Sequence, residues 1–106
     1  MFFESTRTYE DFRNQVSPTI LPIFEELRMY CLALEKNVIE DVRQHRVVMC
    51  KSFTFRWFAD LEPQENQIII KIQKSRKKPP TVLTVSYFEE IAKIKNLLKT
   101  AYEEIH

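Results

Sequence analysis

Two predicted strands and the turn between them lie in residues 53–72, FTFRWFADLEPQENQIIIKI. Up to residue 61, side chains alternate in the way that is typical of a strand with one buried face. The alternation places Phe53, Phe55, Trp57, Ala59 and Leu61 on one face, and Thr54, Arg56, Phe58 and Asp60 on the other. A polar turn over 62–66 and a second alternating run over 67–73 follow. A short turn between adjacent strands predicts an antiparallel pair.

Shorter strands and two helices are predicted outward from this hairpin. Apolar runs at 47–49 and 82–85 add one strand on each side. Near the start of the chain, Thr8 is a predicted N-cap of a short helix, in which Phe12 and Val16 lie four residues apart. Ser17 as N-cap and Pro18 as first helical residue then begin an amphipathic helix of about 18 residues.

The last predicted helix begins after Ser86, with Glu89 at the capping-box position. Its apolar stripe consists of Phe88, Ile91, Ile94, Leu97, Leu98, Ala101, Tyr102 and Ile105. The predicted class is α+β, with two N-terminal helices, a four-stranded and mostly antiparallel sheet, and a C-terminal helix packed on the sheet. We expect one domain over residues 1–106, with a helical extension over 1–16 and a core over 17–106.

The composition is that of an ordinary globular domain and excludes several functional classes. Of 106 residues, 44% are hydrophobic and 29% charged, and the formal net charge is +1. The sequence contains no glycine, so it has no P-loop or dinucleotide-binding fingerprint. No apolar run approaches the roughly 18–20 residues of a membrane span, and the start lacks the pattern of a signal peptide. We therefore expect a cytoplasmic protein with no membrane partner, in which Cys31 and Cys50 are reduced thiols.

Residue types that carry catalysis are scarce. His45 and His106 are the two histidines of the sequence. Cys50 lies five residues after His45, and strand alternation places the two side chains on opposite sides. Two cysteines and one internal histidine do not complete a four-ligand zinc site without carboxylates. Because no nucleophile, base and orienting group stand out together, the sequence predicts a protein that is not an enzyme and has no catalytic residues, metal or cofactor.

The segment KSFTFRWF at 51–58 has two interpretations. Its spacing is similar to the aromatic octamer of RNA-recognition sheets, whose rings stack on unpaired bases. The positions at which that octamer favours glycine hold other residues here, and the RNA-recognition fold begins strand–helix–strand. In the interpretation that we favour, Trp57 and the phenylalanines two and four residues before it form the buried face beneath the helices. Arg56 and Phe58 then face outward.

A basic segment follows the second strand of the hairpin. Its positively charged residues are Lys71, Lys74, Arg76, Lys77 and Lys78. Such a cluster can bind phosphates through counterion release, without distinguishing base sequence. It can also be a solvated loop that keeps a sheet edge from pairing with other chains, and this is the interpretation that we favour.

Several parts of the chain resemble an uncharacterised bacterial domain family, whose members occur alone or at the C-terminal side of restriction-type nuclease and related proteins. The similar segments are 23–28 (IFEELR), 32–38 (LALEKNV), 53–64, 68–72 and 94–102 (IKNLLKTAY). The resemblance covers roughly residues 18–104. Residues 74–80 stand where the family has a glycine-rich segment with tryptophan. The resemblance implies a bacterial, phage or mobile-element setting near DNA-targeting systems.

A complete predicted core without a recognisable active site favours a small non-catalytic interaction or accessory domain. We expect it to bind a protein partner, a second copy of itself included, in a bacterial or phage DNA-targeting or defence context. An exposed sheet edge, or the face with Arg56 and Phe58, would supply the contact area, since interfaces are rich in aromatic residues and arginine. The alternative is a nucleic-acid-binding accessory module that uses the basic segment 71–78, together with Arg56 and Trp57.

Overall fold

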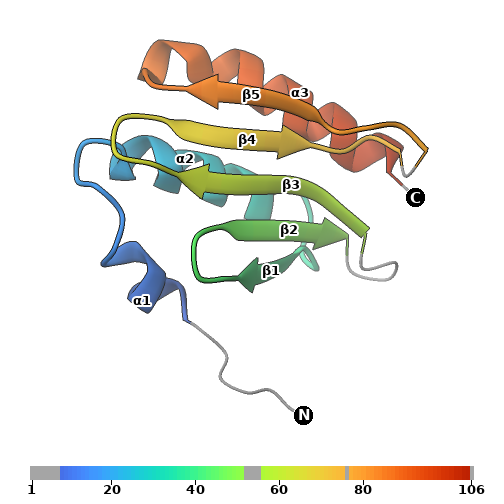
Figure 1. Ribbon diagram of the computed structural model, residues 1–106. Helices are drawn as coiled ribbons and strands as arrows, with labels where there is room; N and C mark the ends of the chain where they lie inside the picture. The colour runs from blue at the N-terminus through green and yellow to red at the C-terminus, as the bar shows by residue number, and fades with distance from the viewer. Residues whose placement is uncertain (1–7, 52–55, 76, 106) are drawn as a thin grey trace.

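Five antiparallel strands and three helices make up the computed structural model of this chain, which describes residues 8–51, 56–75 and 77–105 (Figure 1). The helices are α1 (Tyr9–Arg13), α2 (Leu21–Leu32) and α3 (Ile91–Glu104), with a 3₁₀ turn η1 (Phe88–Glu90) before α3. The strands are β1 (Ile39–Val42), β2 (Val47–Lys51), β3 (Arg56–Pro63), β4 (Ile68–Ile72) and β5 (Thr81–Val85). They lie side by side in sequence order. The α+β prediction is confirmed, with five strands where four were predicted.

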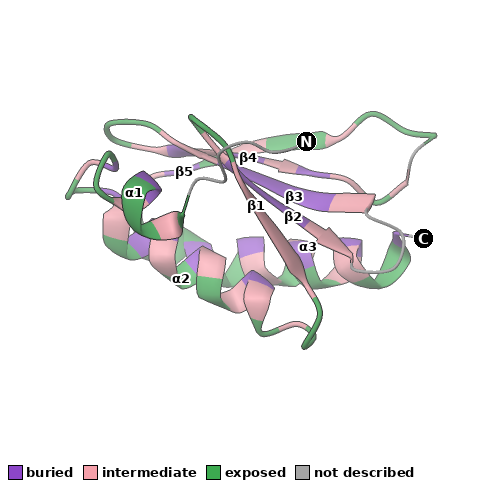
Figure 2. Ribbon diagram, turned by 90° about the horizontal axis from the view of Figure 1, so that it is seen from below, coloured by how far each residue is buried: buried purple, intermediate pink, exposed green. Residues whose placement is uncertain are grey.

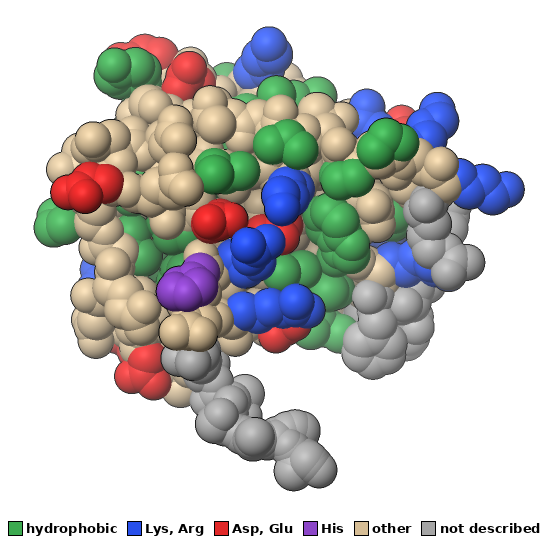
Figure 3. Space-filling model, in the orientation of Figure 1, with side chains coloured by type: hydrophobic (Ala, Val, Ile, Leu, Met, Phe, Trp, Pro, Cys, Tyr) green, Lys and Arg blue, Asp and Glu red, His purple; other side chains and the backbone are tan. Residues whose placement is uncertain are grey.

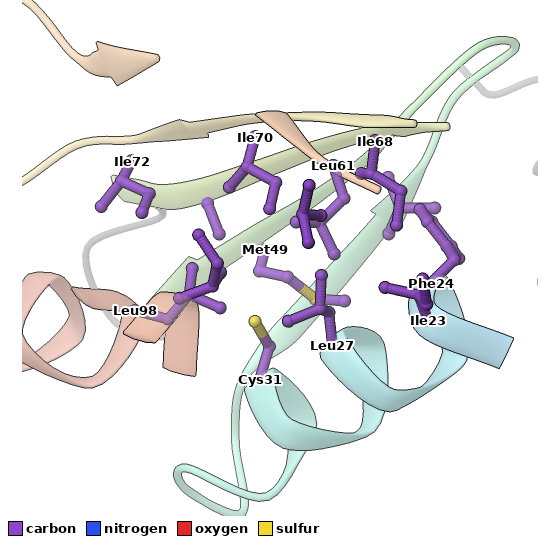
Figure 4. Close-up of a cluster of buried hydrophobic side chains, with 14 of the residues drawn as sticks. Ile23, Phe24, Leu27, Cys31, Met49, Leu61, Ile68, Ile70, Ile72 and Leu98 are labelled. Carbon is purple, nitrogen blue, oxygen red and sulfur yellow. The ribbon is translucent and has the colours of Figure 1, made fainter. Parts of the chain in front are cut away.

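Helices α2 and α3 lie next to each other against one face of the sheet (Figure 2). The opposite face has no helix over it in the described part of the chain, and it is the face seen in Figure 3. The core fills the space between the sheet and the helices (Figure 4). Its labelled members are Ile23, Phe24, Leu27, Cys31, Met49, Leu61, Ile68, Ile70, Ile72 and Leu98. Burial of these apolar side chains is the main favourable contribution to folding.

Helix α1 begins as the sequence predicts. The hydroxyl of Thr8 accepts a hydrogen bond from the backbone N–H of Asp11 at 3.1 Å, which caps the helix. Phe12 and Val16 are both buried in the core. The Phe12 ring packs against the Phe24 ring of α2 with 5.7 Å between centroids, so α1 is attached to α2 by aromatic contact.

Helix α2 begins later than predicted, and proline chemistry explains the difference. Residues 18–20 form a turn, and Pro22 is the second residue of α2. A helix that began at Pro18 would place Pro22 in its second turn, where the missing N–H and the ring disrupt the hydrogen-bond ladder. The hydroxyl of Ser17 accepts from the N–H of Thr19 at 3.3 Å, within the turn, and does not cap α2. The helix also ends earlier, at Leu32.

The sequence did not predict strand β1. Glu40 and Asp41 occupy its two middle positions, so the segment lacks the apolar alternation of a recognisable strand. Pairing with β2 and an ion pair from α2 hold it in place. The guanidinium of Arg28 donates from Nη2 to Glu40 Oε1 at 2.9 Å and from Nε to the other carboxylate oxygen. Such a two-point contact between distant elements has no local sequence pattern.

A β-bulge in β3 breaks the alternation on which the sequence prediction depended. Met49 on β2 lies opposite Ala59, whereas the next residue, Cys50, lies opposite Trp57. Phe58 is therefore an extra residue on β3. Phe58 and Ala59 are both fully buried, although they are consecutive. The prediction that Phe58 is an exposed contact residue is wrong.

Phe58 and Arg56 both lie on the side of the sheet that the helices cover. The Phe58 ring meets Tyr102 of α3 edge to face, with 5.2 Å between centroids. Arg56 lies opposite Lys51, whose ammonium donates to the backbone carbonyl of Ile105 at 2.9 Å. The sequence predicted that Arg56 and Phe58 face outward, whereas in the structure both face the helix layer.

Trp57 faces away from the helices, because it lies between Arg56 and Phe58 and opposite Cys50. It is half-buried and not part of the core between the layers. The prediction that Trp57 lies beneath the helices is wrong. Phe53 and Phe55, which the same alternation placed there, lie outside the described residues.

The bulge predicts losses of stability of different size for two adjacent aromatic substitutions. Phe58→Ala removes a fully buried ring and should lower the free energy of unfolding by about 3–4 kcal/mol. Trp57→Ala removes a half-buried ring from the uncovered face and should cost about 1 kcal/mol. Denaturant unfolding followed by circular dichroism measures both. A larger loss for Trp57→Ala than for Phe58→Ala would contradict this arrangement.

Candidate functional site

The sheet face turned away from α2 and α3, called the open face below, carries both charged and apolar side chains (Figure 3). Residues directly opposite each other in antiparallel strands share a face. From β1 to β5 the open face consists of Ile39, Asp41, Val48, Cys50, Trp57, Asp60, Glu62, Ile69, Lys71, Val82 and Thr84. Five of these residues form one row across all five strands, from Asp41 through Val48, Asp60 and Lys71 to Val82.

In the middle of the open face, positively and negatively charged side chains lie next to each other in equal number. Arg46, in the turn between β1 and β2, contacts two acids, with Nη1 3.1 Å from Asp60 Oδ2 and Nη2 3.1 Å from Glu62 Oε1. Lys71 lies directly opposite Asp60 on the neighbouring strand. Two bases thus stand beside two acids. This part of the face lacks the net positive charge that binding to a phosphate backbone requires.

The structure divides the predicted basic segment between the sheet and a turn. Lys71 lies on β4, on the open face. Lys74, Lys77 and Lys78 are exposed in the connection between β4 and β5. Arg76 lies outside the described residues. The three exposed lysines therefore form a basic turn at one end of the sheet, separate from the matched charges of the open face.

Trp57 lies at the same end of the sheet as the basic turn. Where β4 leads into the turn, the N–H of Gln73 donates to the carbonyl of Phe58 at 3.1 Å, which places Gln73 beside the start of β3. Of the predicted binding residues, the structure thus brings Trp57 close to the chain that carries Lys74. It leaves Arg56 and Phe58 on the opposite side of the sheet.

The two edges of the sheet differ in their protection. On β1, Glu40 and Asp41 place charge at the edge, and Glu40 is tied to Arg28. Strand β5, TVLTV, contains no charge and no proline, and no other described strand pairs with its outer side. Charges, prolines and bulges are the usual means by which proteins keep an edge strand from pairing with another chain. By this criterion β1 is protected against pairing with another chain and β5 is not.

Large apolar side chains are exposed along and just after β5. Val82 is 56% exposed, Tyr87 67% and Phe88 53%. The sequence placed Phe88 in the buried stripe of the last helix, and this is wrong because η1 precedes α3 and turns the ring outward. These three side chains lie along one edge of the sheet, and exposed apolar groups along an edge favour an interaction surface. The uncharged run between Pro80 and Ser86 was the available sequence signal for this edge.

The capping carboxylate before α3 also differs from the prediction. The carboxylate is that of Glu90 and not that of Glu89, because η1 shifts the cap by one position. Glu90 Oε1 accepts hydrogen bonds from the backbone N–H groups of Ser86 at 2.8 Å and Tyr87 at 3.1 Å. These two bonds hold the pKa of Glu90 below its ordinary value. They also fix the backbone that carries Tyr87 and Phe88 at the end of β5.

A cleft of about 540 Å³ lies at the opposite end of the sheet from the basic turn. It is bordered by the segment between α1 and α2 and by the β1–β2 and β3–β4 turns. His45, Glu62 and Glu65 are its ionisable side chains. Within residues 8–51, 56–75 and 77–105, no three His, Cys, Asp or Glu side chains stand together as a metal site.

Comparison of the chain with protein-family models, curated proteins and solved structures found no match. The resemblance to an uncharacterised bacterial domain family therefore stays a prediction, as does the DNA-targeting or defence context. Among the described helices, none has the length and apolar character needed to cross a membrane. The function proposed below depends on the geometry of the sheet.

The two thiols are free and differ in burial. Cys31 is fully buried in the core, and burial raises the pKa of its thiol to about 12. Cys50 lies on the open face beside Trp57 and is half-buried, and partial burial raises the pKa of its thiol above the ordinary value. Neither thiol is an activated nucleophile, because activation requires a lowered pKa.

The difference between the thiols gives a test of the open face. Since the thiolate is the reactive form, the raised pKa of Cys50 should make alkylation slow at pH 8 and faster as the pH rises past 9. Cys31 should stay unmodified until the protein unfolds. Iodoacetamide labelling with peptide mass spectrometry, using Cys31→Ala and Cys50→Ala as controls, distinguishes the sites. Faster native labelling of Cys31 would show that the helices do not cover it.

Proposed function

We propose that this chain is a protein-interaction domain that binds an extended segment of a partner along the outer side of β5. The observation that carries the proposal is the contrast between the two sheet edges. Edge β1 has acids and an ion pair with Arg28, whereas β5 is uncharged and has Val82 exposed. A domain that kept both edges from pairing would carry similar protection on each.

The geometry of β5 is suited to addition of a strand. Alternate residues of an edge strand direct their backbone N–H and C=O groups outward, where a partner strand accepts and donates hydrogen bonds. Val82 and Thr84 lie on the open face, and Leu83 lies on the helix side. An added strand therefore meets an apolar side chain on each face. Tyr87 and Phe88 extend the apolar contact beyond the end of β5.

Site-specific photo-crosslinking in cells of the chain's own host tests this proposal. A benzoylphenylalanine replaces Val82 in one variant and Met29 in the other. Met29 is the matched control because it lies on α2 and is 57% exposed, against 56% for Val82. We expect discrete protein adducts from position 82 and background only from position 29, identified by mass spectrometry of the adducts.

Two results would contradict the proposal. One is the absence of adducts at position 82 when the variant is folded and expressed as well as the control. The other is the same pattern of adducts from both positions, because it would show non-specific hydrophobic association of exposed apolar positions and not recognition by β5.

Nucleic-acid binding is a second candidate, favoured by one observation. Trp57 on the open face lies at the same end of the sheet as the turn with Lys74, Lys77 and Lys78. A ring that stacks on bases beside lysines that contact phosphates is a common arrangement for single strands. The matched acids and bases in the middle of the open face make this candidate weaker than the first.

Fluorescence of Trp57, the single tryptophan, tests the second candidate directly. If the chain binds nucleic acid there, single-stranded oligonucleotides should quench the emission to saturation, and the affinity should fall about tenfold or more between 50 mM and 200 mM salt. Replacing Lys74, Lys77 and Lys78 by glutamate should abolish the quenching. The same change at Lys93 and Lys99, exposed on α3, is the control. Emission that no oligonucleotide changes would eliminate this candidate.

A further inference from the structure

We infer that the segment bound along β5 is the β5 strand of a second copy of this chain, so that two copies form one continuous antiparallel sheet. This inference rests on the proposed function and names its partner. Antiparallel pairing of two identical edge strands is related by a two-fold axis, the commonest symmetry of soluble dimers. The three observations that follow concern the strand, its flanking segments and α3.

The first observation is that β5 is compatible with itself. If two copies pair about Leu83, each residue before this position lies opposite the residue equally far after it in the other copy. Thr81 then lies opposite Val85, and Val82 lies opposite Thr84. These pairs join β-branched side chains, which pack well across antiparallel strands. No like charges meet, because β5 has none.

The second observation is that the segments flanking β5 carry opposite charge. The same two-fold places the chain before β5 of one copy beside the chain after β5 of the other. Lys77, in the turn before β5 of one copy, then lies at the same end of the interface as Glu89, in η1 of the other copy. Lys77, Glu89 and Tyr87 are all exposed in the single chain. The symmetry produces each contact twice, so the charge complementarity counts at both ends of the interface.

The third observation concerns the flank of α3 that faces away from α2. Lys95 contacts Glu26 of α2 at 2.6 Å, so Lys95 marks the flank of α3 that faces α2. The flank that faces away from α2 is on the other side of the helix. At about 100° per residue, this opposite flank carries Lys93, Leu97 and Glu104. Figure 1 shows α3 along the β5 side of the molecule and α2 further toward β3. When two β5 edges pair, the N-terminal end of this flank, with Lys93, lies nearer the other copy, whereas the C-terminal end, with Glu104, lies toward β3 and away from the β5 edge.

The other edge does not permit the same association. Self-pairing of β1 about its middle would bring Glu40 and Asp41 of one copy beside Asp41 and Glu40 of the other. Like charges placed opposite each other destabilise an antiparallel pair. Pairing through β5 alone closes a dimer, so the association does not continue into a fibre.

Sedimentation velocity of the purified chain over a range of concentrations tests the inference. We expect a reversible dimer. Val82→Lys, which places a charge on β5, should raise the dissociation constant about a hundredfold. Met29→Lys, the matched change on α2, should leave the dissociation constant unchanged. Circular dichroism of both variants verifies that they fold.

Charge reversal in the flanking segments distinguishes β5 pairing from any other dimer. Lys77→Glu alone and Glu89→Lys alone should each weaken the dimer about tenfold, because each reversal places like charges at both ends of the interface. The double variant should restore the dissociation constant to within about threefold of the original. Both positions are exposed, so neither single change removes a buried contact.

The outcomes separate this inference from the proposed function on which it rests. A chain that stays monomeric at every concentration, or a dimer that Val82→Lys does not weaken, overturns the second copy as partner. Failure of the double reversal to restore the dimer overturns the two-fold arrangement that brings the flanking segments together. In each case photo-crosslinks from position 82 to a different protein would still support binding along β5. Absence of those adducts as well would overturn both.

Discussion

The arrangement depends on one constraint, which is that two helices must cover a five-stranded sheet. A helix with its side chains is about 10–12 Å wide, so α2 and α3 together cover a little over 20 Å. Five strands at about 4.8 Å extend across about 24 Å. The helices therefore suffice for the middle of one face and leave the outer strands less well covered. The chain solves this at β1 with the Arg28–Glu40 ion pair, which ties the edge to α2. At β5 the described residues form no equivalent ion pair with a helix, and Leu83, on the helix side, is only partly buried.

The same constraint explains the bulge in β3. The C-terminal end of α3 passes over the start of β3, where Phe58 packs edge to face on Tyr102. A regular strand would direct Phe58 and Ala59 to opposite faces. The bulge turns both toward the helices, so the sheet gains a large core side chain at the place where α3 ends. The cost is that Trp57 lies on the open face. Core packing at one position thus decides which aromatic ring is available for binding.

Much of the fold follows from local patterns, and most of the candidate site does not. The hairpin of β3 and β4, the cap at Thr8 and the helical stripes were predictable because propensity, caps and alternation agree there. The strand β1 was not, because an ion pair with α2 holds it. The side of the sheet on which Trp57 lies was not predictable, because the alternation pattern does not reveal the extra residue of a bulge. The lysine turn was predicted as a loop and is one. Which strand lies at an edge depends on the order of all five, so the exposure of Val82 could not be inferred from residues 81–85 alone.

The open face and the β5 edge offer a partner different opportunities. On the open face, Arg46 forms ion pairs with Asp60 and Glu62, so a partner that lies there must either leave these contacts intact or break them. Breaking them would leave the largely buried carboxylate of Asp60 without its ion-pair partner, which costs free energy. At the edge, the outward N–H and C=O groups of β5 are in contact with solvent and can exchange water for a strand without loss of an internal contact. Backbone pairing gives affinity, but it does not choose among partners, so selectivity must come from the side chains beside the strand. In the dimer that we infer, those side chains include Lys77 before β5 and Glu89 after it, and an antiparallel partner is favoured when it carries the same two charges in the same order.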